Sequence, residues 1–193
     1  MSSDYLMGLR RELLKETFGT VLEIGFGTGL NLSCYPEQVK RIITVDPNMG
    51  MNRLVRKKID QSKIPVDIHY LGGESLPFEN NYFDSVVSSW TMCSIEALEQ
   101  ALNEVYRVLK PGSKFYFLEH GLSPEKSVQT WQNRLNPIQK ICGDGCQLTV
   151  NIKEVIDHSP LEWEELKEFY MNSAPKFLGY TYQGIALKPK KTK

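Results

Sequence analysis

The chain has little cysteine and no cysteine framework. Its four cysteines include no C-x-x-C pair, so a disulfide scaffold is not expected and the thiols should stay reduced. Cys142 and Cys146 could supply two metal ligands, but the nearest histidine in the sequence is His158 and there is no second cysteine pair. We therefore predict no metal site. We interpret all four as small apolar residues near a pocket wall, namely Cys34, Cys93, Cys142 and Cys146.

The chain also lacks long apolar runs and net charge. No stretch approaches the roughly 20 apolar residues that span a bilayer, and the N-terminus has no signal-peptide core. The 23 basic and 23 acidic residues balance, which disfavours a nucleic-acid partner. We therefore expect a single cytoplasmic domain over residues 1–193 without an integral membrane segment. Peripheral membrane contact is expected only if the substrate is a lipid.

What the sequence does have is a glycine-rich turn after an apolar strand. Residues 21–29 read VLEIGFGTG, in which Gly25, Gly27 and Gly29 follow Glu23. Glycines let the backbone turn tightly and touch a ligand directly. The spacing is not G-x-G-x-x-G and the P-loop ending is absent, which argues against a pyrophosphate ligand. A buried acid suits a cation such as the methionine half of S-adenosylmethionine, although an ordinary strand-to-helix turn is the alternative.

A second acidic residue follows the next apolar run. Asp46 ends the run RIITVD and lies 21 residues after Gly25, with Pro47 beside it. That position matches the acid that hydrogen-bonds a ribose diol in doubly wound folds. An Asx turn or helix cap at Asp46 is the alternative, and it is compatible with ribose binding.

Apolar strands alternate with amphipathic helices along the chain, which predicts a parallel sheet covered on both faces. Ligands in such folds bind beyond the carboxyl ends of the strands. Helices are expected at 4–18, 29–35, 48–58, 95–109 and 151–158. Strands are expected at 21–24, 41–46, 66–70, 83–90, 114–119, 164–171 and 180–188, although propensity alone would equally allow a helix at 162–169.

With these motifs in this order, the chain resembles the class I S-adenosylmethionine-dependent methyltransferases. The matching segments are VLEIGFGTGLN, ITVDPN, GGESLPFENNYFDSVVSS, ALNEVYRVLKPGSKFYFLEH and YTYQGIALK. The segments CSIEALEQALNEVYRVLKPGSKFYFLEHG and CGDGCQLT are most similar to the group of methyltransferase-like 7 thiol methyltransferases and bacterial phospholipid or quinone methyltransferases. The resemblance implies a Rossmann-like α/β fold with seven strands, mostly parallel, the last antiparallel.

The resemblance also implies which residues hold the cofactor, S-adenosylmethionine. Glu23 and the glycines at 25, 27 and 29 would hold its methionine portion, Asp46 and Pro47 its ribose, and Ser89 and Trp90 would lie beside the sulfonium. The adenine would contact Gly73, Glu74 and Ser75. Many relatives carry an acid at the position of Gly72, so adenine recognition must differ here.

The expected reaction is in-line methyl transfer to a small, amphiphilic acceptor bearing a thiol, quinone or lipid headgroup. Glu119 and His120, at the end of a strand, are the candidate bases, although His120 could equally be structural. The N-terminal helix 4–18 and the insertion 121–147 are expected to form a substrate lid. Trp131 in that insertion is interpreted as core rather than as a substrate platform. The alternative function is a cofactor-binding regulator without turnover.

Overall fold

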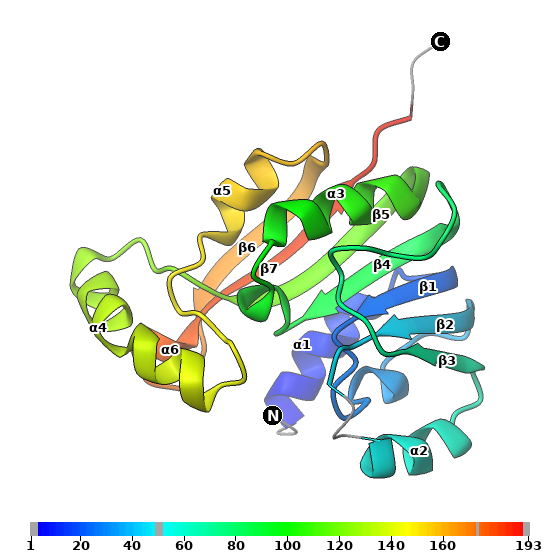
Figure 1. Ribbon diagram of the computed structural model, residues 1–193, viewed down its shortest axis with the longest axis horizontal. Helices are drawn as coiled ribbons and strands as arrows, with labels where there is room; N and C mark the ends of the chain where they lie inside the picture. The colour runs from blue at the N-terminus through cyan, green and yellow to red at the C-terminus, as the bar shows by residue number, and fades with distance from the viewer. Residues whose placement is uncertain (1–3, 49–51, 173, 191–193) are drawn as a thin grey trace.

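The computed structural model describes residues 4–48, 52–172 and 174–190. Their strands form one seven-stranded sheet in the order β3-β2-β1-β4-β5-β7-β6 (Figure 1). The first five strands run parallel, and β7 lies antiparallel between β5 and β6, as predicted. The strands are β1 Gly19–Ile24, β2 Val39–Val45, β3 Val66–His69, β4 Phe83–Ser89, β5 Leu109–His120, β6 Glu162–Tyr170 and β7 Tyr180–Leu187.

Helices cover both faces of this sheet, which confirms the predicted Rossmann-like α/β architecture. Helix α1 packs on one face against β5, while α3 and α5 pack together on the other (Figure 1). The helices are α1 Asp4–Leu14, α2 Asn52–Asp60, α3 Leu98–Val108, α4 Lys126–Cys142, α5 Ile152–Asp157 and α6 Lys176–Gly179, with 3₁₀ turns η1 Asn31–Ser33 and η3 Met92–Ser94.

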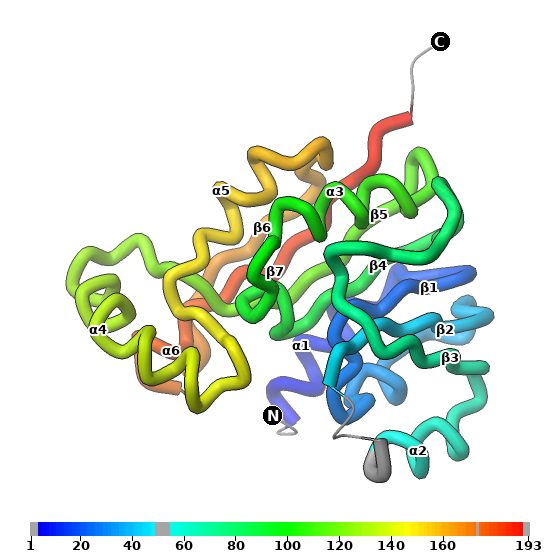
Figure 2. Tube along the Cα trace, in the orientation of Figure 1, coloured from blue at the N-terminus to red at the C-terminus, as the bar shows by residue number. Residues whose placement is uncertain are grey.

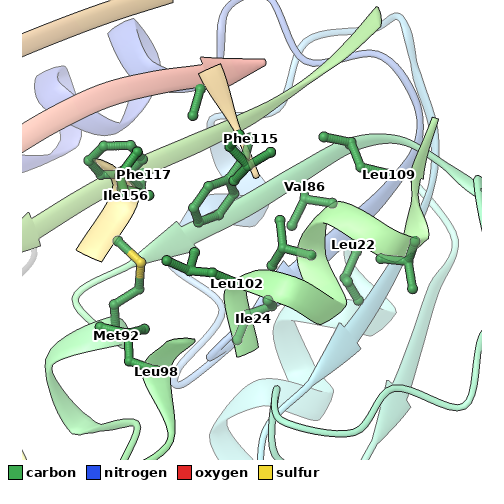
Figure 3. Packing of buried hydrophobic residues seen from close by; sticks show 14 of the residues in the cluster. Leu22, Ile24, Val86, Met92, Leu98, Leu102, Leu109, Phe115, Phe117 and Ile156 are labelled. Carbon is green, nitrogen blue, oxygen red and sulfur yellow. The ribbon is translucent and has the colours of Figure 1, made fainter. Parts of the chain in front are cut away.

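The strand pleat divides the core into two clusters. Successive side chains of a strand point to opposite faces, so Leu22 joins the cluster beneath α3 and Val21 joins the one beneath α1. Phe115 and Tyr116 of β5 divide in the same way. Figure 3 shows the first cluster, in which Leu102 of α3 lies among strand residues. Burial on both faces explains the consecutive apolar residues in the middle of these strands, which are Val21 and Leu22 in β1, Val86 and Val87 in β4, and 115–118 in β5.

Two predicted helices are shorter than expected. Helix α1 ends at Leu14, where the Thr17 amide and hydroxyl both donate to the Leu14 carbonyl oxygen, so residues 15–18 are not helical. Only the 3₁₀ turn at 31–33 forms where a helix at 29–35 was predicted, because Pro36 disfavours helical geometry in the residue before it. The predicted helix at 48–58 is observed as α2, and positions 49–51 lie outside the described residues.

The prediction that Trp131 belongs to the core is wrong. Helix α4 of the insertion lies with α6 at one end of the molecule (Figure 1) and buries Val128 and Gln132. Trp131 lies on a different side of that helix, 54% exposed, with the Arg134 guanidinium 5.7 Å from its ring centre. The core of the sheet does not include Trp131, and α4 buries only the side that carries Val128 and Gln132.

Candidate active site

A pocket of about 880 Å³ lies at the carboxyl ends of the central strands. This is the edge at which parallel α/β sheets bind ligands, and its size suits a nucleoside-containing cofactor together with part of an acceptor. Its walls combine the glycine turn after β1, the end of β2, the loop after β3 and the segment after β4. Residues from α1 and from the loop after α4 complete it, namely Arg10, Gly143 and Asp144.

The glycine turn is held in a conformation that other residues adopt at a cost. Gly25, Gly27 and Gly29 have φ angles of +79°, +51° and +65°, in the left-handed region. A Cβ atom on Gly25 would overlap the Thr91 side chain, whereas one on Gly27 would meet no atom within 4 Å. Gly25 and Gly27 line the pocket. The Gly27 main chain is therefore open to a ligand.

Asp46 fixes this turn from the neighbouring strand. One carboxylate oxygen accepts a hydrogen bond of 2.8 Å from the Gly27 amide, and the other accepts one of 2.9 Å from the Asn48 amide. The second bond is the Asx turn considered as an alternative for Asp46. Asp46 and Pro47 both line the pocket, so Asp46 can form the Asx turn and still contact a ligand.

Glu23 is a buried acid at the floor of the pocket. Its Oε1 accepts from Asn31 Nδ2 at 2.8 Å, and its Oε2 accepts from the Tyr35 hydroxyl at 2.8 Å. Burial raises the pKa of Glu23 to about 7, against these hydrogen bonds and the charge of Arg10. Near neutral pH the carboxyl is therefore poised to ionise when a cation arrives beside it.

Arg10 is the main pocket-lining residue that the sequence did not predict. Its guanidinium donates to Asn31 Oδ1 and, at 2.9 Å, to Ser89 Oγ, and it lies 4.7 Å from the ring centre of Trp90. Its side chain is buried, and Nε has no hydrogen-bond partner among the described residues. A signal was present, because Arg10 shares the apolar face of α1 with Leu6 and Leu13.

On the predicted adenine side, the structure brings only part of the expected set to the pocket. Gly72, Gly73 and Glu74 line it, whereas Ser75 is exposed and does not. A Cβ atom on Gly72 would overlap Glu74 Oε2. The Glu74 carboxylate therefore occupies the space into which an acid at position 72 would project.

Ser89 and Trp90 line the pocket at the end of β4, as expected, but Glu119 does not. Trp90 has φ of +53°, and its amide donates to the Leu118 carbonyl. Glu119 is fully buried, and its oxygens accept from the Thr91 amide at 2.9 and 3.0 Å and from Ser88 Oγ at 2.9 Å. Burial raises its pKa against these bonds. The carboxylate thereby holds the strained segment that follows β4.

His120 lies behind this segment, beside two cysteines that sequence reasoning did not connect with it. Its Nε2 is 3.3 Å from Cys146 Sγ and 3.8 Å from Cys93 Sγ, and the two sulfurs are 3.5 Å apart. A hydrogen bond from Cys93 and the contact with His120 lower the pKa of Cys146, while burial opposes this. Burial also opposes the charged form of His120, but contact with Cys146 raises its pKa overall.

Comparison with known proteins agrees with this geometry. A family model described as a methyltransferase domain matches residues 22–117. The thiol S-methyltransferase TMT1B of Rattus norvegicus is 31% identical over 83% of the chain and 69% of its own length. The ubiquinone/menaquinone biosynthesis C-methyltransferase UbiE of Vibrio cholerae is 33% identical over 51% of the chain and 40% of its length. The crystal structure of a methyltransferase from Bacillus halodurans superposes with a TM-score of 0.75 at 16% identity, covering 95% of this chain and 99% of the other.

The chain belongs to the class I S-adenosylmethionine-dependent methyltransferases. It uses S-adenosylmethionine to transfer a methyl group to a small acceptor. These comparisons give no support to the alternative of a regulator without turnover. Among the described residues, no helix is long and apolar enough to cross a membrane.

Proposed function

We propose that the methyl acceptor is the thiol group of a small, largely apolar molecule. The supporting observation is how much of the chain is similar to each kind of methyltransferase. The thiol methyltransferase matches over 83% of the chain, whereas the quinone methyltransferase matches over 51%, although their identities are close. Similarity confined to half the chain can reflect a shared cofactor site, because the domain model itself covers residues 22–117. The thiol methyltransferase match is long enough to include acceptor-side segments as well.

The pocket offers complementary partners to each part of S-adenosylmethionine, and this supports the predicted cofactor assignment. Glu23 and Arg10 both line the pocket. Glu23 would balance the ammonium and sulfonium charges, and the guanidinium of Arg10 would balance the methionine carboxylate. Asp46 would accept from the ribose hydroxyls, and Glu74 from the adenine amino group. The remaining contacts that we assign to the cofactor come from Gly25, Gly27, Pro47, Gly73 and Ser89, which line the pocket. Gly29 shapes the turn with a φ of +65°, and Ser75 lies outside the pocket, so neither is assigned a contact.

The acceptor would enter at the other end of the pocket, where Ile95 and Trp90 supply apolar surface and Thr91 and Ser94 supply hydroxyl groups. We assign the lid to helix α1 with the residues up to Phe18, and to the insertion 121–147. From the insertion, the loop after α4 reaches the pocket, whereas α4 itself does not line it.

A thiol must lose its proton before it attacks the methyl group, because the thiolate is the nucleophile. Of the two predicted bases, Glu119 already accepts hydrogen bonds from Ser88 and Thr91 at both oxygens. We therefore assign Glu119 to positioning of the segment after β4. His120 does not line the pocket either, but it contacts Cys93, whose neighbour Ser94 does. Of the two residues, we therefore keep His120 as the candidate that acts on the acceptor.

Matched acceptors test the thiol assignment. The purified protein is incubated with S-adenosylmethionine and, separately, with a small aromatic thiol, the phenol of the same carbon frame and a reduced quinone, and products are identified by mass spectrometry. We expect S-methylation of the thiol at a kcat/KM at least about 100-fold above that for the phenol. A reduced quinone methylated in preference to the thiol would contradict the proposal, as would methylation of the phenol alone.

A further inference from the structure

We propose that Cys93, His120 and Cys146 bind a zinc ion, and that the open fourth position of this ion takes the sulfur of the acceptor thiol. The second half of this proposal rests on the thiol acceptor proposed above. The first half rests on the geometry of the three side chains alone. They come from the 3₁₀ turn η3, the end of β5 and the loop that follows α4.

The three ligand atoms are spaced as a tetrahedral zinc site requires. With Zn–S bonds of about 2.3 Å and Zn–N bonds of about 2.0 to 2.1 Å, two sulfurs lie about 3.8 Å apart and a sulfur and a nitrogen about 3.6 Å apart. The observed separations are 3.5 Å for the two sulfurs and 3.3 and 3.8 Å for the sulfur–nitrogen pairs. One ion can therefore contact all three atoms with little movement of the chain.

The protein holds these side chains in place from several directions. The Gln147 amide donates to the Cys93 carbonyl oxygen at 2.9 Å, which joins the loop after α4 to η3. The loop turns sharply through Asp144 and Gly145, with φ angles of +53° and +83°, immediately before Cys146. In Figure 2 this yellow segment returns from α4 toward the end of β4. Cys93 and Cys146 are buried and His120 is partly buried, so the two sulfur ligands are sheltered from bulk water.

Three protein ligands are the number found in catalytic zinc sites, whereas structural zinc sites have four. Within the part of the chain that the structure describes, no fourth histidine, cysteine or carboxylate joins the cluster. Neighbours of the cluster line the pocket on two sides, with Ser94 next to Cys93 and Asp144 two residues before Cys146. Cys93, His120 and Cys146 do not themselves line the pocket, so these neighbours connect the cluster to it, and we place the open fourth position on the side that faces the acceptor end.

Zinc at this position would solve the problem of the thiol proton. An acceptor RSH that binds zinc does so as the thiolate, and its proton leaves to water. The zinc-bound sulfur then forms a bond to the methyl carbon while the bond from that carbon to the sulfonium sulfur breaks. The products are the thioether RSCH₃ and S-adenosylhomocysteine, and the positive charge of the sulfonium is neutralised by the negative charge of the thiolate. His120 then acts as a ligand, and no general base is required.

Metal analysis and cobalt spectroscopy test the metal site without reference to activity. We expect about one zinc per chain in protein purified under reducing conditions, and Co²⁺ exchanged into the site should show sulfur-to-cobalt charge-transfer absorption. Cys93→Ser, Cys146→Ser and His120→Ala should each weaken metal binding by at least about tenfold. Cys142→Ser is the matched control, because Cys142 is exposed in the same segment, and it should bind metal like the unmodified chain.

The folded state and the acceptor ligation are checked separately. Removing zinc from the unmodified chain with a strong chelator should abolish thiol methylation while S-adenosylhomocysteine still binds, which excludes misfolding as the cause. Adding an acceptor thiol, but not its alcohol analogue, should change the cobalt d–d spectrum. Reduced protein that binds neither zinc nor cobalt would overturn the metal site, and the cluster would then be a set of hydrogen-bonded thiols or a redox pair.

If cobalt binds but its d–d spectrum does not change when the thiol is added, the thiol does not ligate the metal, and the ion would then be structural. If thiols shift that spectrum but are never methylated, the proposed function fails while the metal site stands.

Discussion

Replacing Gly25 by alanine is expected to unfold the protein at a much lower temperature. The added Cβ would overlap three atoms of the Thr91 side chain, and the residue would have to keep a φ of +79°. Left-handed geometry costs an L residue about 1 to 2 kcal/mol, and forcing an extra carbon into packed space costs about 1 to 3 kcal/mol more. For a chain of this size each kcal/mol lowers Tm by about 2 to 4 °C. Thermal unfolding measured by circular dichroism gives the result.

Gly27→Ala is the matched control, because Gly27 lies in the same turn with a positive φ but is not packed against another side chain. Its Cβ would meet no protein atom within 4 Å, so only the backbone term of about 1 to 2 kcal/mol applies to stability. Its cofactor affinity should fall by at least about tenfold, because the methyl group enters the space where the ligand touches main chain. Equal losses of Tm in the two variants, with unchanged affinity for Gly27→Ala, would show that the pocket above this turn is not the cofactor site.

Arg10→Ala is expected to have the second large effect, on both stability and cofactor binding. Arg10 is a buried cation that donates to Asn31 and Ser89 and lies over Trp90. Hydrogen bonds to a charged group contribute about 1.5 to 3 kcal/mol, and the buried Asn31 and Ser89 would lose theirs to the guanidinium. The pKa of Glu23 should rise further, since the charge of Arg10 is one of the influences that hold it down.

Arg11→Ala controls for the general effect of losing an arginine from α1. Arg11 is exposed and adjacent in sequence, so its replacement should change stability by no more than about 0.5 kcal/mol. Denaturant unfolding and calorimetric titration with S-adenosylhomocysteine are measured on both variants. If Arg10→Ala were as mild as Arg11→Ala, Arg10 would have no role in holding the pocket floor.

The sheet was predictable from the sequence because its signals are local. The central strands are apolar on both faces, the glycine turn follows the first of them, and Asp46 ends the second. Strand β6 was the ambiguous element, because its residues carry mixed charges and include good helix formers. It forms a strand because β7 provides a partner along its whole length, which is a tertiary effect that propensity does not contain.

The cysteine and histidine cluster was hidden from sequence reasoning for a different reason. Cys93 and Cys146 are separated by 53 positions, and His120 lies between them, so no spacing motif relates them. Only the return of the loop after α4 to η3 brings them together. The two cysteines close in sequence are Cys142 and Cys146, and of these only Cys146 belongs to the cluster, because Cys142 is exposed and lies outside it. Non-local clusters of this kind need the fold before they can be recognised.

The raised pKa of Glu23 makes both the stability of the protein and its affinity for the cofactor depend on pH. Its pKa in the folded, cofactor-free protein is about 7, above the ordinary value of 4.5. The native state therefore binds more protons than the unfolded state between these values, and this group makes the free energy of unfolding fall as pH rises through that window. A cationic ligand beside Glu23 favours the ionised carboxylate, so S-adenosylmethionine should bind with release of a proton near pH 7.

Isothermal titration of the cofactor at pH 7 tests the central claim most directly. In two buffers of different ionisation enthalpy, S-adenosylmethionine should bind with release of about half a proton, and the Glu23→Gln variant should bind without it. S-adenosylhomocysteine should bind as well, and NAD should give no heat of binding. Binding of NAD in the absence of any binding of S-adenosylmethionine or S-adenosylhomocysteine would contradict the account.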